Sequence, residues 1–215
     1  LLVLGFKPNK LEARKDYVKT DIFLRINENL EVGVSLKSST KTSFHQLDRR
    51  RLEEWKVLLD MPENIFETFK EAILRVSRNS KSKFILEKDR DEIKEFLTNR
   101  LETIIKEIFR KEEESLKILM INDKVKRKIY VFHIDEVINF LIKNAREKLS
   151  FSKKGIVRLG DFITIQRKGG NGEHIKIPKT DWRHPGNQLQ FKFSPLMFAE
   201  YIEREMPIRC CTITY

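Results

Sequence analysis

The stretch Lys19-Thr-Asp-Ile-Phe-Leu-Arg-Ile-Asn-Glu-Asn-Leu-Glu-Val-Gly-Val-Ser-Leu-Lys-Ser38 decides the fold. Apolar and polar residues alternate on both sides of an Asn-Glu-Asn turn, with the period of two that a half-buried strand requires. The apolar positions are the even-numbered residues Ile22, Leu24, Ile26, Leu30, Val32, Val34 and Leu36. The stretch therefore predicts a hairpin of two strands with one apolar face.

The register of this hairpin follows from its apolar face, because a slip of one residue would turn a whole strand to the wrong side. Pairing Ile26 with Leu30 across a three-residue loop keeps the even-numbered residues of both strands together. The same register sets Asp21 opposite Ser35 and leaves Lys37 on the diagonal, within reach of a long side chain. An acid and a lysine are therefore expected to meet on the polar face of the hairpin.

This arrangement resembles the catalytic core of the PD-(D/E)xK nuclease superfamily. There, an Asp at the end of one strand and a (D/E)-x-K on the next build a Mg²⁺ site. Asp21 matches the first element and Ser35-Leu-Lys37 the second, with Thr20 in place of Pro and Ser35 in place of the second carboxylate. With Phe44-His-Gln46 downstream, the pattern is similar to a group of type II restriction endonucleases that carry Ser at this position.

The resemblance implies an α/β (α+β) fold of the restriction-endonuclease type, in which a central mixed β-sheet is flanked by helices and carries a helical insertion. It also implies a catalytic role for each hairpin residue. Asp21 would bind Mg²⁺ directly, and the backbone carbonyl of Leu36 would be a second ligand. Lys37 would orient or help to deprotonate the attacking water and stabilise the charge of the transition state.

Two further site residues are expected outside the hairpin. Ser35 can hold a water but brings no negative charge, so a second carboxylate must come from elsewhere. Many nucleases of the resembled fold supply a Glu from a helix before the hairpin. Glu12 is the candidate here, and a solvated surface Glu is the alternative reading. Gln46 is expected in the first turn of a helix over 44–59, either facing the site or as an ordinary first-turn residue.

Composition points to an acidic partner. The chain has 215 residues, 35% of them charged, and a net charge of +11. Nucleic acid is the commonest partner of such a surface, and a merely soluble basic protein is the alternative. No Walker loop, Rossmann GxGxxG or HExxH motif is present. Nucleotide cradles and zinc-protease chemistry are therefore not indicated.

The cysteines and the hydrophobic runs indicate the compartment. Cys210 and Cys211 are adjacent, a spacing that suits neither a disulfide framework nor a zinc site, so a reducing cytosolic setting is expected. No apolar run reaches the ~18–20 residues of a membrane span. With the restriction-enzyme resemblance, these features predict a prokaryotic cytoplasmic protein. Because the chain opens on Leu1, we expect it to begin inside a longer gene product.

We expect one restriction-endonuclease-like domain over residues 1–215, with three parts. Residues 1–60 hold the catalytic hairpin and its following helix, and residues 61–116 form a helical block with helices over 62–78 and 87–116. Residues 117–215 complete the sheet and carry a DNA-recognition region. An apolar run at 117–121 and a polar turn precede a strand expected at 128–133. Further strands are expected around 163–166, at 187–193 and in the C-terminal tail, and helices from 135 and over 196–206.

The recognition region is identified by its charge. Residues 146–192 contain eleven Lys or Arg against four Asp or Glu. Arg and Lys read guanine and Asn and Gln read adenine in the major groove, while Lys also positions phosphates. A β-hairpin with a polar loop and solvated charges is the alternative reading. The candidate DNA contacts are Gln166, Arg167, Lys168, Asn171, Gln188, Gln190 and Lys192.

The leading hypothesis from sequence is a Mg²⁺-dependent type II restriction endonuclease that cleaves double-stranded DNA at a specific site, as a homodimer. Two alternatives remain open. One is a non-catalytic DNA-binding module in which the Asp/Lys face is only a charged surface. The other is a structure-specific nuclease of repair or recombination, which shares the chemistry and lacks a fixed site.

Overall fold

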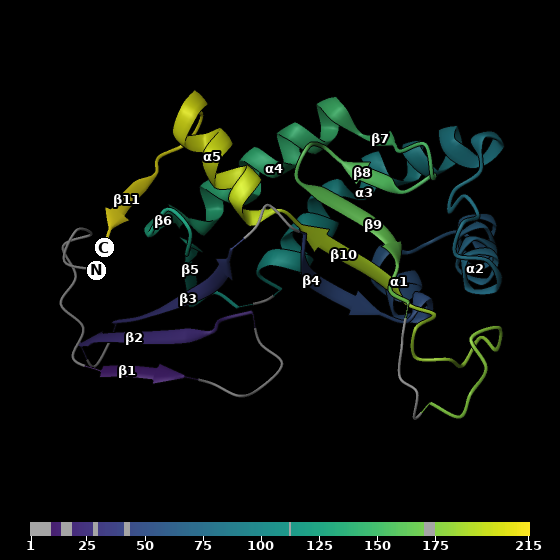
Figure 1. The fold of residues 1–215 in the computed structure, drawn as a ribbon, viewed down its shortest axis with the longest axis horizontal. Helices are drawn as coiled ribbons and strands as arrows, with labels where there is room; N and C mark the ends of the chain where they lie inside the picture. Colours follow the sequence, from purple (N-terminus) through teal and green to yellow (C-terminus); the bar gives the residue numbers. More distant parts are fainter. Residues whose placement is uncertain (1–9, 14–18, 28–29, 41–43, 112, 170–174) are drawn as a thin grey trace. The chain divides into compact units, whose positions relative to one another are not determined.

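A computed structural model describes residues 10–13, 19–27, 30–40, 44–111, 113–169 and 175–215 of the chain (Figure 1). The chain divides into two compact units. Unit 1 comprises residues 1–44, 105–141 and 194–215, and unit 2 comprises residues 45–104 and 142–193. Each unit is therefore built from segments that lie far apart in the sequence.

Unit 1 contains a six-stranded mixed sheet with the strand order β1-β2-β3-β5-β6-β11. The β3–β5 pair is parallel, whereas the other neighbours are antiparallel. This is the mixed sheet that the sequence predicts. The strands are β1 (Lys10–Ala13), β2 (Ile22–Asn27), β3 (Leu30–Ser39), β5 (Leu116–Asp123), β6 (Lys128–His133) and β11 (Cys211–Thr214).

The predicted hairpin is β2 and β3, and its register is the expected one along most of its length. Ile22 pairs with Val34 and Leu24 with Val32, and Leu24, Val32 and Val34 belong to a buried apolar cluster. The turn end differs, because Asn27 rather than Ile26 pairs with Leu30 across a bulge. The bulge leaves the apolar alternation toward Asp21 unchanged.

Aromatic side chains attach two helices to the sheet of unit 1. Phe198 of α5 (Pro195–Glu205) lies with its ring centroid 5.3 Å from that of Phe132 in β6 and 6.0 Å from that of Phe140 in α4 (Ile134–Lys148). Pro195 occupies the first turn of α5, where its missing N–H has no helical partner to lose. Both helices begin where the sequence predicts.

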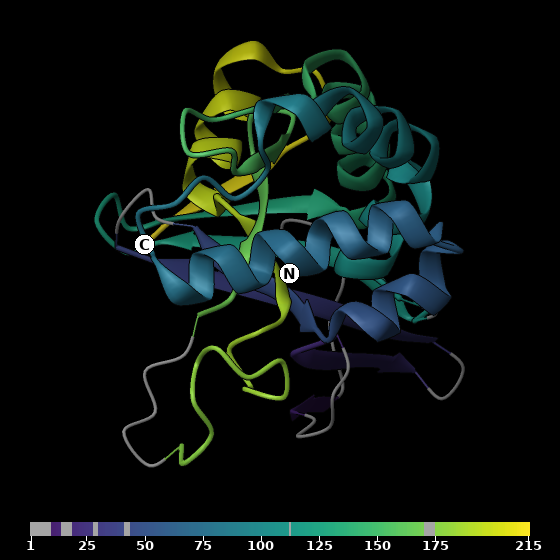
Figure 2. The same cartoon turned by 90° about the vertical axis from the view of Figure 1, so that its right-hand side faces the viewer.

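Unit 2 contains a five-stranded antiparallel sheet in the order β4-β10-β9-β8-β7. Trp55 of α1 (Leu52–Leu59) packs on Phe191 of β10, which lies between β4 and β9, with 4.6 Å between ring centroids. In Figure 2 residues 175–188, which precede β10, extend beyond the strands β9 and β10. The strands are β4 (His45–Arg50), β7 (Ser150–Phe151), β8 (Val157–Leu159), β9 (Ile163–Arg167) and β10 (Leu189–Phe193).

The helical block of residues 61–116 is mostly as predicted. The helices α1 (Leu52–Leu59), α2 (Glu63–Arg78) and α3 (Arg90–Phe109) follow one another, with a 3-10 turn over Glu87–Asp89 before α3. α3 ends at Phe109 rather than at residue 116, and β5 begins at Leu116. The short connection 110–115 therefore leads directly into the strand that lies beside β3.

Two predicted elements are wrong. Residues 10–13, expected as a helix end or loop, form the edge strand β1, in which Glu12 pairs with Phe23. The helix expected over 44–59 begins only at Leu52, and His45–Arg50 form β4. Gln46 is therefore a strand residue and not a first-turn helical one.

None of the helices that the structure describes combines the length and the hydrophobicity that crossing a membrane requires.

Candidate active site

Asp21 lies immediately before β2, where its backbone and its side chain are both held by β3. Its N–H donates to the carbonyl of Val34 at 2.9 Å. Its carboxylate oxygen Oδ2 accepts hydrogen bonds from the N–H of Leu36 at 2.6 Å and from Ser35 Oγ at 3.3 Å. The side chain is 48% exposed. A fixed carboxylate thus faces solvent at the end of the hairpin.

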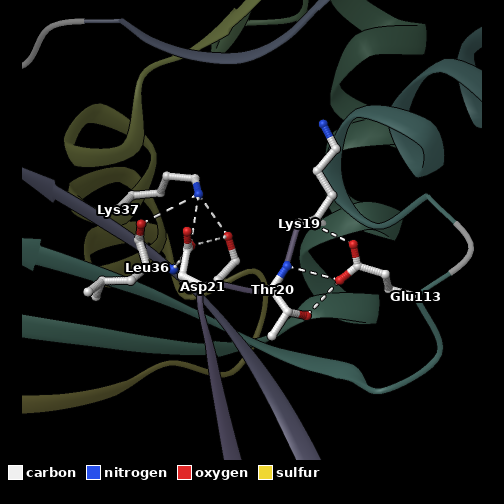
Figure 3. A network of polar contacts seen from close by, with 7 residues as sticks. Lys19, Thr20, Asp21, Leu36, Lys37 and Glu113 are labelled. Atoms are coloured by element: carbon white, nitrogen blue, oxygen red, sulfur yellow. Dashed lines mark hydrogen bonds and ion pairs between the residues drawn. The ribbon is translucent and has the colours of Figure 1, made fainter. Parts of the chain in front are cut away.

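Lys37 completes the cluster that the register predicts. Its Nζ lies 3.5 Å from Asp21 Oδ2 and donates to Ser35 Oγ at 2.8 Å (Figure 3). The hydroxyl of Ser35 therefore stands between the acid and the lysine, donating to one and accepting from the other. Lys37 is only 20% exposed, so its ammonium is confined near the carboxylate instead of ranging through solvent.

The oxygens of this cluster suit a hard divalent cation. Alternate residues of a strand direct their N–H and C=O to the same neighbour. The backbone N–H and C=O groups of Val34 and Leu36 point toward β2. Because β2 begins only at Ile22, the carbonyl of Leu36 lies outside the hydrogen-bond ladder between the two strands. From the described residues it accepts a single long contact of 3.5 Å, from Lys37 Nζ. Mg²⁺ is commonly bound by one or two carboxylates together with substrate phosphates, and Asp21 with this carbonyl fits that pattern.

A second carboxylate ligand is not identified. Among the described residues, no group of three or more His, Cys, Asp or Glu is arranged to hold a metal ion. Glu12 lies in the edge strand β1. Its backbone pairs with that of Phe23 in β2, which is two residues after Asp21. Its role as a ligand stays a prediction.

A carboxylate that the sequence did not indicate lies beside the site. Glu113, in the connection between α3 and β5, accepts hydrogen bonds from the backbone N–H groups of Lys19 and Thr20. It also accepts one from the hydroxyl of Thr20, at 2.7 Å (Figure 3). Thr20 is 2% exposed. Thr20 is thus anchored by Glu113, and no sequence signal links it to a Glu 93 residues away.

In unit 2 the strand register gathers polar side chains on one face of the sheet. Residues directly opposite in antiparallel strands project to the same face. Gln190 pairs with Arg49 and Gln166, and Lys192 pairs with Gln46 and Thr164. We call this surface the glutamine face; its members are Gln46, Arg49, Thr164, Gln166, Gln190 and Lys192. None of them is acidic.

The glutamine face differs from the predicted recognition set in its most accessible members. Gln190 is 7% exposed and its amide donates to Gln46 Oε1 at 2.7 Å. Gln46 and Arg49 are exposed, and Gln166 and Lys192 are half-buried. In this conformation Gln190 therefore orients Gln46, which the sequence analysis assigned to the catalytic site. Arg49 is not among the DNA contacts predicted from the sequence.

Arg167, Lys168 and Gln188 have a different setting. Arg167 follows Gln166 in β9, so its side chain projects to the other face of the sheet. Its Nε donates a hydrogen bond to Oδ1 of the buried Asn187 at 2.8 Å. Its Nη2 is buried and, like Gln188 Oε1, has no hydrogen-bond partner among the described residues. Burial lowers the pKa of Arg167 and of Lys168, and the nearby Arg49 lowers the pKa of Lys168 further. Asn171, also predicted to bind DNA, lies outside the described residues.

No family model matches the sequence, and no curated protein matches it either. Among solved structures, the chain is similar to the crystal structure of restriction endonuclease MspI in complex with its cognate DNA. The TM-score is 0.55 at 15% sequence identity, over 85% of this chain and 69% of that chain. At this identity the similarity shows the fold, which is of the restriction-endonuclease type, as the hairpin motif predicts.

Proposed function

We propose that this protein is a Mg²⁺-dependent endonuclease of type II restriction character, which hydrolyses phosphodiester bonds of double-stranded DNA at a specific site. The observation that carries the proposal is the contact of Asp21, Ser35 and Lys37 at the end of the β2–β3 hairpin. The restriction-endonuclease-like fold supports it, because this is the place at which the resembled family builds its catalytic centre.

Each functional residue of the hairpin would have its own role in phosphodiester hydrolysis. Asp21, through the carboxylate oxygen Oδ1, and the Leu36 carbonyl would hold Mg²⁺, with Glu12 as a further candidate ligand. When bound, the ion lowers the pKa of water and polarises the phosphate. Lys37 brings a positive charge to the place where negative charge develops on the phosphate oxygens. Ser35 keeps the Lys37 ammonium directed at that place through the 2.8 Å hydrogen bond.

DNA would be contacted by the glutamine face and by the basic loop that follows β9. Gln46 and Gln166 offer paired amide donors and acceptors suited to adenine, and Arg49 and Lys192 suit guanine or phosphate. Exposure favours Gln46 and Arg49 as the direct contacts, with Gln190 acting through Gln46. Arg167, Lys168, Asn171 and Gln188 remain candidates on the loop.

Plasmid cleavage tests the proposal. Purified protein should convert supercoiled plasmid or phage DNA into discrete fragments with Mg²⁺, and should leave it intact in EDTA. Retardation of the duplex without cleavage would instead identify a non-catalytic DNA-binding module. Cutting of branched substrates without a fixed banding pattern would indicate a structure-specific nuclease. A restriction role would also place the protein in the prokaryotic cytoplasm, acting as a homodimer.

A further inference from the structure

The connection between α3 and β5 holds the chain on both sides of the hairpin's catalytic end. Glu113 receives two consecutive backbone N–H groups, those of Lys19 and Thr20, and the Thr20 hydroxyl. Two residues later, the carbonyl of Ser115 accepts the N–H of Gly33 in β3 at 2.7 Å. One short segment therefore fixes the entry to β2 relative to the middle of β3.

Gly33 makes this arrangement tight. A Cβ at Gly33 would lie 2.7 Å from Thr20 Oγ1 and 3.0 Å from Leu116 Cα, so the absence of a side chain lets Thr20 and the start of β5 approach β3. The Thr20 side chain therefore lies in a narrow space against the backbone of Gly33. Its hydroxyl has a defined partner there in the Glu113 carboxylate, with which it makes a charge-assisted hydrogen bond.

Asp21 follows Thr20 directly and is anchored from the other direction. Its N–H is bound to Val34, and its carboxylate to the N–H of Leu36. Glu113 on one side and β3 on the other thus leave the Thr20–Asp21 peptide little freedom. Misplacement of a reacting group by about 1 Å can reduce catalysis about 100-fold.

We infer that Glu113 is a positioning residue of the proposed nuclease site, which sets the place of the Asp21 carboxylate by holding the backbone and hydroxyl of Thr20. The inference rests on the proposed function. Glu113 acts through Thr20 and does not itself bind metal or substrate. Its loss therefore impairs the catalytic step and the use of Mg²⁺, and leaves the affinity for DNA unchanged.

Substitutions on both sides of the contact test this inference. Glu113→Gln replaces one acceptor oxygen by an NH₂ group that cannot accept from the Lys19 or Thr20 donors, and Thr20→Val removes the hydroxyl at constant size. We expect Glu113→Gln to lower kcat by about 10- to 100-fold and to raise the Mg²⁺ concentration for half-maximal rate. Binding of the duplex in Ca²⁺ should change less than about twofold. Thr20→Val should have a smaller effect, and Thr20→Ser should restore the rate.

The exposed neighbour provides the matched control. Glu114→Gln removes the same charge one residue away and should keep the wild-type rate and Mg²⁺ dependence. All rates are compared well below each variant's Tm, so that loss of folded protein is not counted as loss of catalysis. A folded Glu113→Gln protein with wild-type kcat and Mg²⁺ dependence would overturn the inference while leaving the nuclease assignment intact.

Hydrogen exchange separates this inference from the function on which it rests. The Thr20 amide should be protected in the wild type and in Glu114→Gln, and should exchange faster in Glu113→Gln. Equal exchange in Glu113→Gln and the wild type would refute the anchoring, whether or not the protein cleaves DNA. Wild-type protein that does not cleave DNA overturns the proposed function, and with it the catalytic part of this inference.

Discussion

At the scale of single residues, the candidate site depends on how one carboxylate divides its hydrogen bonds. Oxygen Oδ2 of Asp21 is occupied by the N–H of Leu36, the hydroxyl of Ser35 and the ammonium of Lys37. These contacts fix the orientation of the carboxylate, and Oδ1 accepts no hydrogen bond from the described residues. A single charged ligand at a preset angle is the arrangement that phosphate oxygens of a substrate can complete around a cation.

Asp21 and Lys37 should be required for cleavage and dispensable for binding. Asp21→Asn keeps the shape and removes the negative charge that would hold Mg²⁺, and Lys37→Ala removes the charge that stabilises the transition state. We expect each to lower the single-turnover rate by about 100- to 1,000-fold or more. Equilibrium binding of a cognate duplex in Ca²⁺ should stay near that of the wild type. Mg²⁺-dependent cleavage retained by both variants would exclude this cluster as the catalytic centre.

Ser35 should have a smaller effect, because its hydroxyl orients Lys37 and carries no charge. Ser35→Ala removes one hydrogen bond to the ammonium, a contribution of about 1 kcal/mol, so we expect the rate to fall by about fivefold. Ser35→Asp would introduce the carboxylate of the (D/E)-x-K pattern that the hairpin resembles, and should lower the Mg²⁺ concentration for half-maximal rate. A Ser35→Ala rate as low as that of Lys37→Ala would mean that Ser35 takes part in the chemistry.

The sequence predicts Asp21, Ser35 and Lys37 as neighbours because alternation and register act over a few residues. It does not predict Glu113, since the contact with Thr20 joins residues 93 positions apart and depends on the parallel pairing of β3 with β5. Thr20 itself looks like an unremarkable replacement of Pro until its partner is known. Long-range contacts of this kind have no local signature.

At the scale of elements, β4 shows why the secondary structure around Gln46 was predicted wrongly. The apolar spacing from Phe44 to Leu59 suits one amphipathic helix, but Arg51 begins a new element. Its N–H donates to Glu54 at the start of α1. The residues before it extend as a strand because β10 offers an antiparallel partner from residue 189 onward. Only tertiary pairing distinguishes the two outcomes, and the strand moves Gln46 to the glutamine face.

Gln46 and Arg49 should affect DNA recognition in different ways. Gln46→Ala removes a candidate base contact, and we expect it to cost about 1–3 kcal/mol for the cognate site with little change for unrelated duplexes. Arg49→Ala should weaken binding to all duplexes alike and reduce the slope of log Kd against log salt by about one. Fluorescence-anisotropy titrations over a salt series measure both. Unchanged cognate affinity in both variants would remove β4 from the DNA interface.

The loop before β10 should lose stability in acid because of His184. This residue is buried, its Nδ1 accepts the N–H of Gly186, and its pKa is lowered first by burial and then by Arg167 and Lys179. A folded pKa below the ordinary value of 6.5 means that the unfolded chain binds the proton more readily. Stability is therefore lost as pH falls below 6.5.

His184→Asn, which keeps an acceptor and does not titrate in this range, should reduce this pH dependence. The measurement is amide exchange of residues 181–188 and thermal unfolding at pH 7.5 and 5.5. The wild type should show lower amide protection factors, each referred to the intrinsic exchange rate at that pH, and should unfold at a lower temperature at pH 5.5, and the variant should show a smaller difference. An equal pH effect in both proteins would assign the acid sensitivity to other groups.

At the scale of the whole molecule, the fold class was predictable because its decisive element is local. The hairpin motif led to the mixed sheet, and the helices expected over 62–78, 87–116 and 196–206 correspond to α2, α3 and α5. The division of the chain into two units was not predictable in this way. Unit 1 combines three segments of the chain and unit 2 combines two, so hydrophobic patterns along the sequence do not separate the two units.

One chain carries one Asp21–Ser35–Lys37 cluster, so cutting both strands of a duplex requires two chains or two successive events. The proposed homodimer would place one cluster at each strand, as the two-fold symmetry of a palindromic site demands. Mixing wild type with a fivefold excess of Lys37→Ala should then shift the first product from linear to nicked plasmid, because nearly all dimers that contain an active subunit then contain only one. The plasmid must exceed total protein, so that competition for DNA is negligible. A product ratio unchanged by the inactive chain would show that each chain cuts alone.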